Sequence, residues 1–259
     1  MANNSRPEAT YYDNSFYEGQ IAESAESARV VLAELFALFQ PCSILDVGCG
    51  RGAWLAAAHE LGCVELCGID GDWIAKEDLI LDSIDFSKKD LNAPLETSRK
   101  FDLAISLEVA EHLPSSRAKS FVFDLCQAAD VVLFGAAIDG QGGTNHINEQ
   151  PQSYWTNLFE EEGYVCIDVL RQSLWNDKRV KWWYVQNTYL YVKYGSEALG
   201  LLHKHVGNDT VFDAVHPLNL KHKVNNLKEL EERIENPTIQ LCLSIIKKYV
   251  KNKIARLSL

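Results

Sequence analysis

Short apolar runs alternate with longer amphipathic stretches from the start of the chain to about Gly195. Apolar runs of a few residues predict buried strands, and apolar positions three and four residues apart predict helices. Strands are expected at residues 43–47, 63–69, 101–107, 130–136, 164–170 and 187–194, with a further strand inside 84–95. Helices are expected at residues 18–39, 53–61 and 153–162, and after Ser115 or Ser116. Alternating strands and helices predict an α/β domain with a mostly parallel sheet.

The pattern changes after residue 195, where residues 218–234 and 238–257 predict two helices. We therefore expect three parts. They are an arm and helix at residues 1–40, a core at residues 41–195 and a helical extension at residues 196–259. The arm is polar and ends in clustered aromatic residues, which suit either surface packing or a lid over a cofactor.

The glycine-rich turn after the first strand is the most informative stretch of the sequence. Asp46 is followed by Gly48, Gly50 and Gly52, and a predicted helix begins at once. A strand that turns through glycines into a helix brings bare backbone close to a ligand. The Gly-Lys-Ser/Thr of an ATP-binding loop is missing, and the third glycine is misplaced for a nicotinamide-binding turn.

Residues 44–52, Ile-Leu-Asp-Val-Gly-Cys-Gly-Arg-Gly, resemble motif I of the class I S-adenosylmethionine (SAM) methyltransferases. The resemblance implies a Rossmann-like seven-stranded sheet with helices on both faces and an antiparallel last strand. It also implies that SAM is the cofactor. By the same resemblance, the SAM-contacting residues are Tyr17, Asp46, Gly48, Cys49, Gly50, Asp70, Gly71, Trp73, Asp90, Leu91, Leu107 and Glu108.

For three of these residues, the position in the sequence also suggests which group they contact. Asp70 ends the second strand about 20 positions past the turn, where a carboxylate typically takes two ribose hydroxyls. Trp73 suits either the adenine face or the core. Asp90 matches the acidic residue that accepts from the adenine amino group in the resembling family, and it equally suits a turn in which a carboxylate caps backbone.

Charge, cysteine usage and hydrophobicity bear on nucleic-acid binding, on the cellular compartment and on membrane insertion. The formal net charge of −11 argues against a broad nucleic-acid surface. The seven cysteines occur singly or as Cys63 and Cys67 around a strand, which indicates reduced core residues in a cytoplasmic protein. No apolar run is long enough to span a bilayer, and residues 1–10 lack a signal-peptide core.

Glu108, Glu111 and His112 follow the fourth predicted strand, and His146 lies in the next strand-to-helix loop. Ligands bind at this end of such sheets, and carboxylates with imidazoles suit Mg²⁺ or Mn²⁺. The pattern resembles metal-dependent O-methyltransferases that act on ubiquinone precursors or on the terminal ribose of small RNAs. It also occurs in metal-free class I methyltransferases, for which His146 would be the general base.

The acceptor is expected to be a small polar molecule. The Asn/Asp-Pro-Pro-Tyr/Phe signature of base methylation is absent, which favours an oxygen acceptor. Residues 134–149, 154–155 and 183–187 resemble bacterial methyltransferases of surface-polysaccharide biosynthesis and related pathways, which implies a carbohydrate-derived or phosphorylated acceptor. Candidate acceptor contacts are Tyr12, Trp175, Arg179 and Trp183, although the aromatic residues of 174–184 equally suit core packing.

The sequence leaves two alternative functions and the partner of the last predicted helix undecided. The chain could methylate the 3′-terminal ribose of an RNA, or it could be a SAM-binding scaffold without catalysis. The last predicted helix has five cations and no acid: Lys247, Lys248, Lys251, Lys253 and Arg256. Such a helix packs on the domain or on a second subunit, or contacts an anionic membrane.

Overall fold

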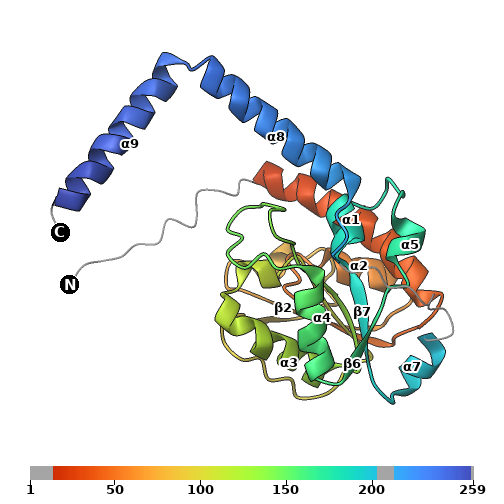
Figure 1. The fold of residues 1–259 in the computed structure, drawn as a ribbon. Coiled ribbons are helices and arrows are strands. Elements are labelled where there is room, and N and C mark those ends of the chain that lie inside the picture. Colours follow the sequence, from red (N-terminus) through yellow and green to blue (C-terminus); the bar gives the residue numbers. More distant parts are fainter. Residues whose placement is uncertain (1–13, 203–212, 258–259) are drawn as a thin grey trace, which may run out of the picture. The chain divides into compact units, whose positions relative to one another are not determined.

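The protein is described from a computed structural model that covers residues 14–202 and 213–257. Within these ranges, the side chains of residues 14–23, 252 and 254–257 are not described. The chain divides into two compact units, Met1–His216 and Pro217–Leu259. The first unit contains the sheet, and the second contains two long helices (Figure 1).

A seven-stranded sheet forms the centre of the first unit, with the strand order β3-β2-β1-β4-β5-β7-β6. All neighbouring pairs are parallel except those of β7, which runs antiparallel to both β5 and β6. The strands are β1 (Ser43–Val47), β2 (Glu65–Asp70), β3 (Asp85–Lys88), β4 (Leu103–Leu107), β5 (Val131–Gly135), β6 (Tyr164–Ile167) and β7 (Tyr189–Lys193). The predicted architecture, including the antiparallel last strand, is confirmed.

The helices lie on both faces of the sheet (Figure 1). The α-helices are α1 (Asn14–Phe36), α2 (Ala53–Glu60), α3 (Ala118–Ala128), α4 (Gln152–Glu161), α5 (Arg171–Leu174), α6 (Trp182–Asn187), α7 (Glu197–Leu202), α8 (Pro217–Glu235) and α9 (Ile239–Leu257). Three short 3₁₀ helices are η1 (Lys76–Asp78), η2 (Ala110–His112) and η3 (Ser115–Arg117). No helix in the described ranges is both long and apolar enough to cross a membrane.

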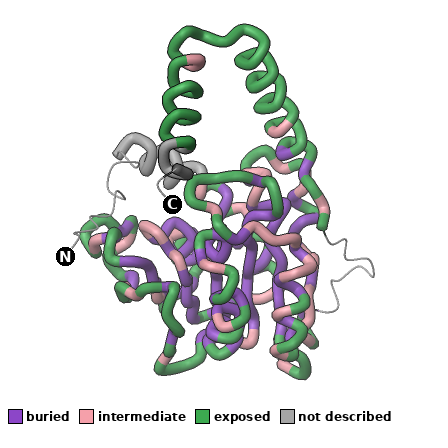
Figure 2. Tube along the Cα trace, turned by 60° about the vertical axis from the view of Figure 1, so that its left-hand side comes forward, coloured by how far each residue is buried: buried purple, intermediate pink, exposed green. Residues whose placement is uncertain are grey.

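Two apolar layers hold the helices against the sheet. Leu32 of α1 and Leu55 of α2 pack in one layer, and Phe121 of α3 and Trp155 of α4 pack in the other. The residues of β1 and β4 are all buried, because their side chains enter both layers in alternation. Figure 2 shows buried residues concentrated in the centre of the first unit. The central strands are therefore rigid, and their carboxyl ends present the loops that carry the candidate site.

The segment between β6 and β7 is helical at its aromatic residues. If strand alternation continued through it, either Trp182 or Trp183 would point outward. This condition is not met, because both residues begin the short helix α6, where both are half-buried. The cysteine prediction also needs one correction, because Cys42 is exposed rather than part of the core; all seven cysteines are unpaired.

Candidate functional site

The turn between β1 and α2 is built on three glycines. Gly48, Gly50 and Gly52 all have left-handed φ values, of 84°, 53° and 82°. A Cβ atom at Gly50 would meet no described atom within 4 Å, so the described residues leave space above Gly50. A Cβ atom at Gly48 would lie 2.3 Å from Cγ2 of Val109, so the turn packs directly on the loop after β4. The two loops thus form one surface.

Asp70 ties this turn to the end of β2. Its carboxylate accepts the backbone N–H of Gly50 and that of Gly71, each at 2.7 Å. Burial raises the pKa of Asp70, while these two hydrogen bonds act in the opposite direction. The carboxylate thus fixes the turn at the position where the sequence predicted a ribose contact.

Asp46 is a buried carboxyl group whose Oδ2 atom has no hydrogen-bond partner in the described part of the chain. Burial, and then the neighbouring charge of Asp70, raise the pKa of Asp46 to about 8. A carboxyl group in this state gains from a cationic ligand, which would stabilise its ionised form. The ammonium and sulfonium groups of SAM meet that requirement.

Glu111, His112 and His146 form a cluster at the carboxyl end of β4. One ligand atom from each of the three lies within 4.8 Å of the others. Glu111 is fully buried, yet neither of its carboxylate oxygens has a hydrogen-bond partner among the described residues. The rings of His112 and His146 meet edge to face, with centroids 4.8 Å apart. A buried carboxylate beside two imidazoles has the chemistry of a divalent-cation site.

Burial and neighbouring groups shift the pKa values in this cluster. Burial, followed by the nearby carboxylate of Glu108, raises the pKa of Glu111 well above its ordinary value. Desolvation, followed by the neighbouring His146, lowers the pKa of His112 although that residue reaches solvent. Both shifts favour the neutral forms when no cation is bound, and a cation would favour ionised Glu111 and neutral imidazoles.

Glu108 stands beside this cluster but is held by amides. Asn187 Nδ2 donates to its Oε1 and Gln141 Nε2 donates to its Oε2, both at 2.9 Å. Its backbone has a left-handed φ of 56°, which is rare for a residue other than glycine and is typical of functional loops. Of the four residues predicted as metal ligands, the structure groups three, and it gives Glu108 two amide partners instead.

The comparisons with known proteins agree with this geometry. Residues 18–128 match a family model described as a methyltransferase domain. An O-methyltransferase family protein from Burkholderia thailandensis superposes with a TM-score of 0.53 at 13% identity, over 71% of this chain and 60% of that one. Magnesium protoporphyrin IX methyltransferase from Synechocystis PCC 6803, solved with bound SAM, superposes with a TM-score of 0.50 at 15% identity, over 70% of this chain and 85% of that one.

The chain has the methyltransferase fold. At these identities the structural likeness establishes the fold alone, and the chain spans only 60% of the Burkholderia protein. A comparison with curated proteins gives no match. The residues matched by the family model, 18–128, include the turn described above.

The remaining predicted cofactor residues lie around this turn with different exposures. Cys49, Leu91 and Leu107 are buried, and the ring of Trp73 lies over Gly71. Trp73 is 69% exposed, so the alternative that it belongs to the core is wrong. Asp90 Oδ1 accepts the backbone N–H of Asn92 at 3.0 Å, as in the turn alternative, and its adenine contact stays a prediction. Tyr12 lies outside the described residues, and only the backbone of Tyr17 is described.

Sequence reasoning missed the residues that support the site. Gln186 Nε2 and Asn187 Nδ2 donate to Oε1 of Gln141, which extends the amide network around Glu108. The carboxylate of Glu149 lies 2.9 Å from Nδ1 of His146 and accepts hydrogen bonds from the backbone N–H groups of Gly140 and Gly142. The only local signal was the position of Glu149, three residues after His146 in a glycine-rich loop.

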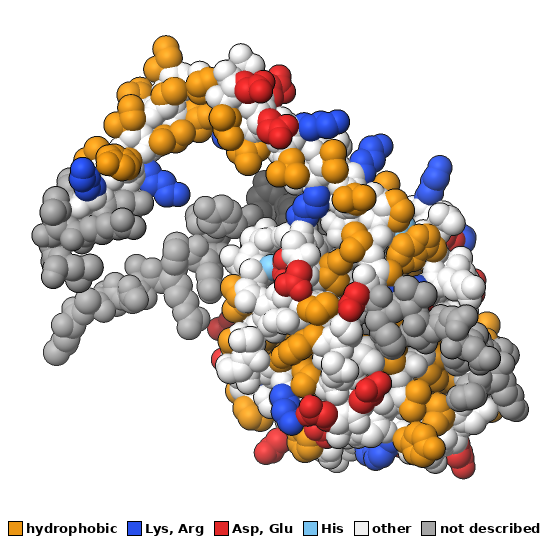
Figure 3. Space-filling model, in the orientation of Figure 1, with side chains coloured by type: hydrophobic (Ala, Val, Ile, Leu, Met, Phe, Trp, Pro, Cys, Tyr) orange, Lys and Arg blue, Asp and Glu red, His pale blue; other side chains and the backbone are white. Residues whose placement is uncertain are grey.

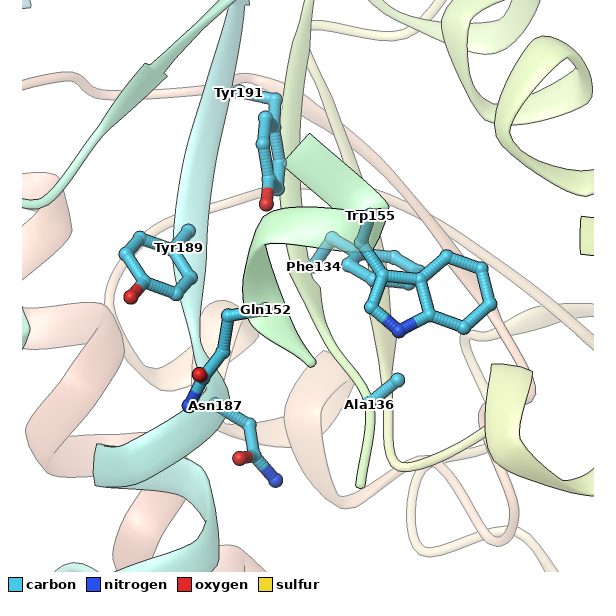
Figure 4. A pocket seen from close by; sticks show the side chains of 7 residues that line it. All are labelled: Phe134, Ala136, Gln152, Trp155, Asn187, Tyr189 and Tyr191. Carbon is cyan, nitrogen blue, oxygen red and sulfur yellow. The ribbon is translucent and has the colours of Figure 1, made fainter. Parts of the chain in front are cut away.

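A narrow pocket lies beside Asn187, lined by side chains from α4 and β7 and by Phe134 of β5 (Figure 4). Gln152 and Asn187 border it beside four aromatic rings, and it has no room for a water molecule. Gln152 Nε2 donates to the carbonyls of Gln186 and Ala214. The pocket is therefore packed support for Asn187, and hence for Glu108, and it is not an acceptor cavity.

The predicted acceptor contacts have mainly structural partners. The ring of Trp175 lies between Arg171 and His216, with centroid distances of 5.7 Å and 4.8 Å. Trp183 packs against the core layer that contains α1 and α2. Arg179 is exposed and forms an ion pair of 2.6 Å with Asp177. Their contact with an acceptor stays a prediction.

Proposed function

We propose that this chain is a SAM-dependent O-methyltransferase that transfers a methyl group to a hydroxyl of a small polar acceptor, either carbohydrate-derived or phosphorylated. The observation that carries the proposal is the buried carboxylate of Glu111. Neither of its oxygens has a hydrogen-bond partner of ordinary geometry among the described residues, although Glu108 and the backbone of Ala137 lie near enough to shift its pKa. It also lies beside two imidazoles, and the loop that carries it packs on the turn after β1.

The residues at the turn fit SAM. The free space above Gly50 admits the methionine half of the cofactor, and buried Asp46 gains from its positive charge. Asp70 Oδ1 and Oδ2 each accept one backbone N–H, and each oxygen has a further lone pair for a ribose hydroxyl. Methyl transfer then needs an acceptor hydroxyl held in line with the methyl group.

The residues after β4 fit Mg²⁺ or Mn²⁺. Glu111, His112 and His146 would hold the ion, with Glu108 beside them to balance its charge. A bound divalent ion lowers the pKa of a coordinated hydroxyl and orients it. In the metal-free alternative, His146 removes the hydroxyl proton through Nε2, because Nδ1 faces Glu149.

Surface residues and cysteine usage support the acceptor class and the location. The exposed cation Arg179 and the half-buried Trp183 suit a phosphate and a sugar face, respectively. Seven unpaired cysteines suit a reducing compartment, so we place the reaction in the cytoplasm. Methylation of an RNA 3′ end is the alternative, and the net charge of −11 weighs against it.

Calorimetry and turnover test the proposal together. We expect SAM to bind the metal-free chain and Mn²⁺ to bind through the Glu111 cluster. Formation of S-adenosylhomocysteine should appear with a panel of sugar phosphates and nucleotide sugars, and excess chelator should stop it. Asp70→Ala should weaken SAM binding by about 1.5–3 kcal/mol, since it removes hydrogen bonds to a charged group.

Other outcomes separate the alternatives. Full turnover in excess chelator would leave only the general-base version with His146. Turnover with an RNA oligonucleotide and none with the sugar panel would favour the RNA alternative. SAM binding without turnover on either panel would favour a non-catalytic scaffold. Absence of SAM binding would overturn the proposal.

A further inference from the structure

The helix α9 carries its charge in an unusual distribution. Residues 238–259 contain five of the chain's 25 basic residues and none of its 36 acidic residues. The rest of the chain therefore has 20 basic and 36 acidic residues. A local cationic segment on an otherwise acidic protein keeps its own field, because exposed charges separated by more than about 8 Å are largely screened at physiological salt.

The same helix exposes an apolar face. Ile239, Leu243, Ile246 and Val250 follow one another at spacings of four and three residues, so they share one side of the helix. Their exposed fractions are 80%, 61%, 58% and 47%, so nothing in the described structure covers them. Figure 3 shows hydrophobic side chains along this unit of the chain, with basic side chains among those of α9.

By helical spacing, Lys247 and Lys251 flank this face on one side and Lys253 adjoins it on the other, whereas Lys248 lies on the opposite side of the helix. Lys247 and Lys251 are one helical turn apart, and both are exposed, as are Lys248 and Lys253. The ammonium group of Lys253 lies 5.7 Å from the ring centre of Tyr249, which is itself 63% exposed. Tyrosine and lysine side chains have apolar bodies and polar tips, and they favour the boundary between lipid and water.

We infer that α9 binds an anionic lipid surface, lying in the plane of the interface with its apolar face inserted and its lysines on the headgroups. Two features of α9 meet there: an apolar stripe for the acyl boundary, and cations for anionic headgroups. The neighbouring helix α8 gives a contrast. It also exposes apolar residues such as Leu227, but its four Lys and Arg residues are balanced by four Glu residues. Charge therefore selects an anionic surface for α9 and not for α8.

Vesicle co-sedimentation of the full chain tests this inference. We expect binding to vesicles of phosphatidylcholine with 30% phosphatidylglycerol, and none to vesicles of phosphatidylcholine alone. Each lysine near an anionic surface contributes about fivefold in affinity, so Lys247→Gln/Lys251→Gln should weaken binding by about 25-fold. Ile246→Asp/Val250→Asp should weaken it by about 100-fold or more, since two apolar side chains no longer insert.

A matched variant controls for charge alone. Lys76 and Lys88 are exposed residues of the first unit, so Lys76→Gln/Lys88→Gln removes the same charge from elsewhere in the chain. This variant should bind vesicles as the unmodified chain does. Melting temperature and SAM binding, measured on every variant, show that the first unit stays folded, and they keep this test separate from that of the proposed function.

Three outcomes would overturn the inference. The first is no binding to anionic vesicles at low salt. The second is binding that the α9 variants and the control reduce equally. The third is a dimer in light scattering that Ile246→Asp/Val250→Asp dissociates, in a chain that does not bind vesicles; the apolar face of α9 would then be a contact between two copies of the chain.

Discussion

Glu149 holds the imidazole of His146 by one ring nitrogen, with 2.9 Å between Oε1 and Nδ1. The same carboxylate accepts the backbone N–H groups of Gly140 and Gly142, at 2.8 Å and 2.6 Å. A carboxylate with two such donors is an acceptor, so Nδ1 of His146 carries the proton. The lone pair then lies on Nε2, which is the arrangement that both a metal ligand and a general base require.

Replacing Glu149 by Gln tests this pairing. Glutamine keeps the shape of the side chain but lacks the negative charge that fixes the tautomer of His146. We expect Mn²⁺ affinity and turnover to fall by about 10–100-fold, as for other residues that orient a metal-bound histidine. SAM affinity should not change. Glu160→Gln, at an exposed position of α4, is the control. A parallel loss of SAM binding would mean that Glu149 only supports the loop.

The strand, glycine turn and helix that carry the predicted cofactor residues could be predicted because their determinants are local. The strand at residues 43–47, the glycines that follow and the helix from Ala53 are consecutive in sequence, and the structure has all three as expected. The grouping of Glu111 with His112 is equally local. The partners of Glu108 are not, since Asn187 is 79 residues away and Gln141 is 33 residues away. No periodic pattern reports contacts at such separations.

Tertiary packing also overrode local preference between β6 and β7. Two tryptophans and a tyrosine in sequence favour a strand by propensity. In the structure they begin α6, where Tyr184 is buried and its hydroxyl lies 3.1 Å from Ser24 Oγ of α1. A contact 160 residues apart in sequence accompanies this helix, and no local pattern contains it.

Glu111→Gln is expected to separate metal binding from folding. Glutamine matches the neutral form of Glu111, which burial favours when no ion is bound. The metal-free melting temperature should therefore stay equal or rise, whereas the increase on adding Mn²⁺ should disappear. Thermal unfolding with Mn²⁺ and with chelator measures both. Glu96→Gln, at an exposed position, should keep the Mn²⁺ response. An Mn²⁺-dependent increase retained in Glu111→Gln would rule out Glu111 as a ligand.

SAM binding should release a proton from Asp46. The pKa of this carboxyl is raised to about 8 in the free protein, so the group is mostly protonated at pH 7. A cationic ligand favours the ionised form and lowers this pKa. Affinity should therefore increase from pH 6.5 to pH 8.5, and the binding enthalpy at pH 7 should depend on the ionisation enthalpy of the buffer.

Asp46→Asn is the matched variant for this effect, because it has the same shape and no proton to release. Its SAM affinity should be lower and should no longer increase over this pH range. Calorimetry in phosphate and in Tris measures the proton count directly. A proton count near zero at pH 7 in the unmodified chain would show that Asp46 is already ionised or does not sense the ligand.

Gly48 and Val109 should be coupled in stability, because the turn after β1 rests on the loop after β4. Gly48→Ala adds a Cβ atom at a left-handed φ of 84° and 2.3 Å from a methyl group of Val109. The left-handed backbone conformation should lower the free energy of unfolding by about 1–2 kcal/mol, and the overpacking against Val109 should lower it by about 1–3 kcal/mol. Val109→Ala removes the clashing methyl groups, so the double variant should recover the overpacking part.

A double-mutant cycle measured by urea unfolding gives this coupling, which we expect to be about 1–3 kcal/mol. Gly50→Ala supplies the control within the same turn. Its φ of 53° is also left-handed, but a Cβ atom there would meet nothing within 4 Å. It should therefore show the backbone cost alone and no coupling to Val109. Equal coupling at Gly48 and Gly50 would contradict the close contact, and with it the single surface that brings the cofactor turn to the Glu111 cluster.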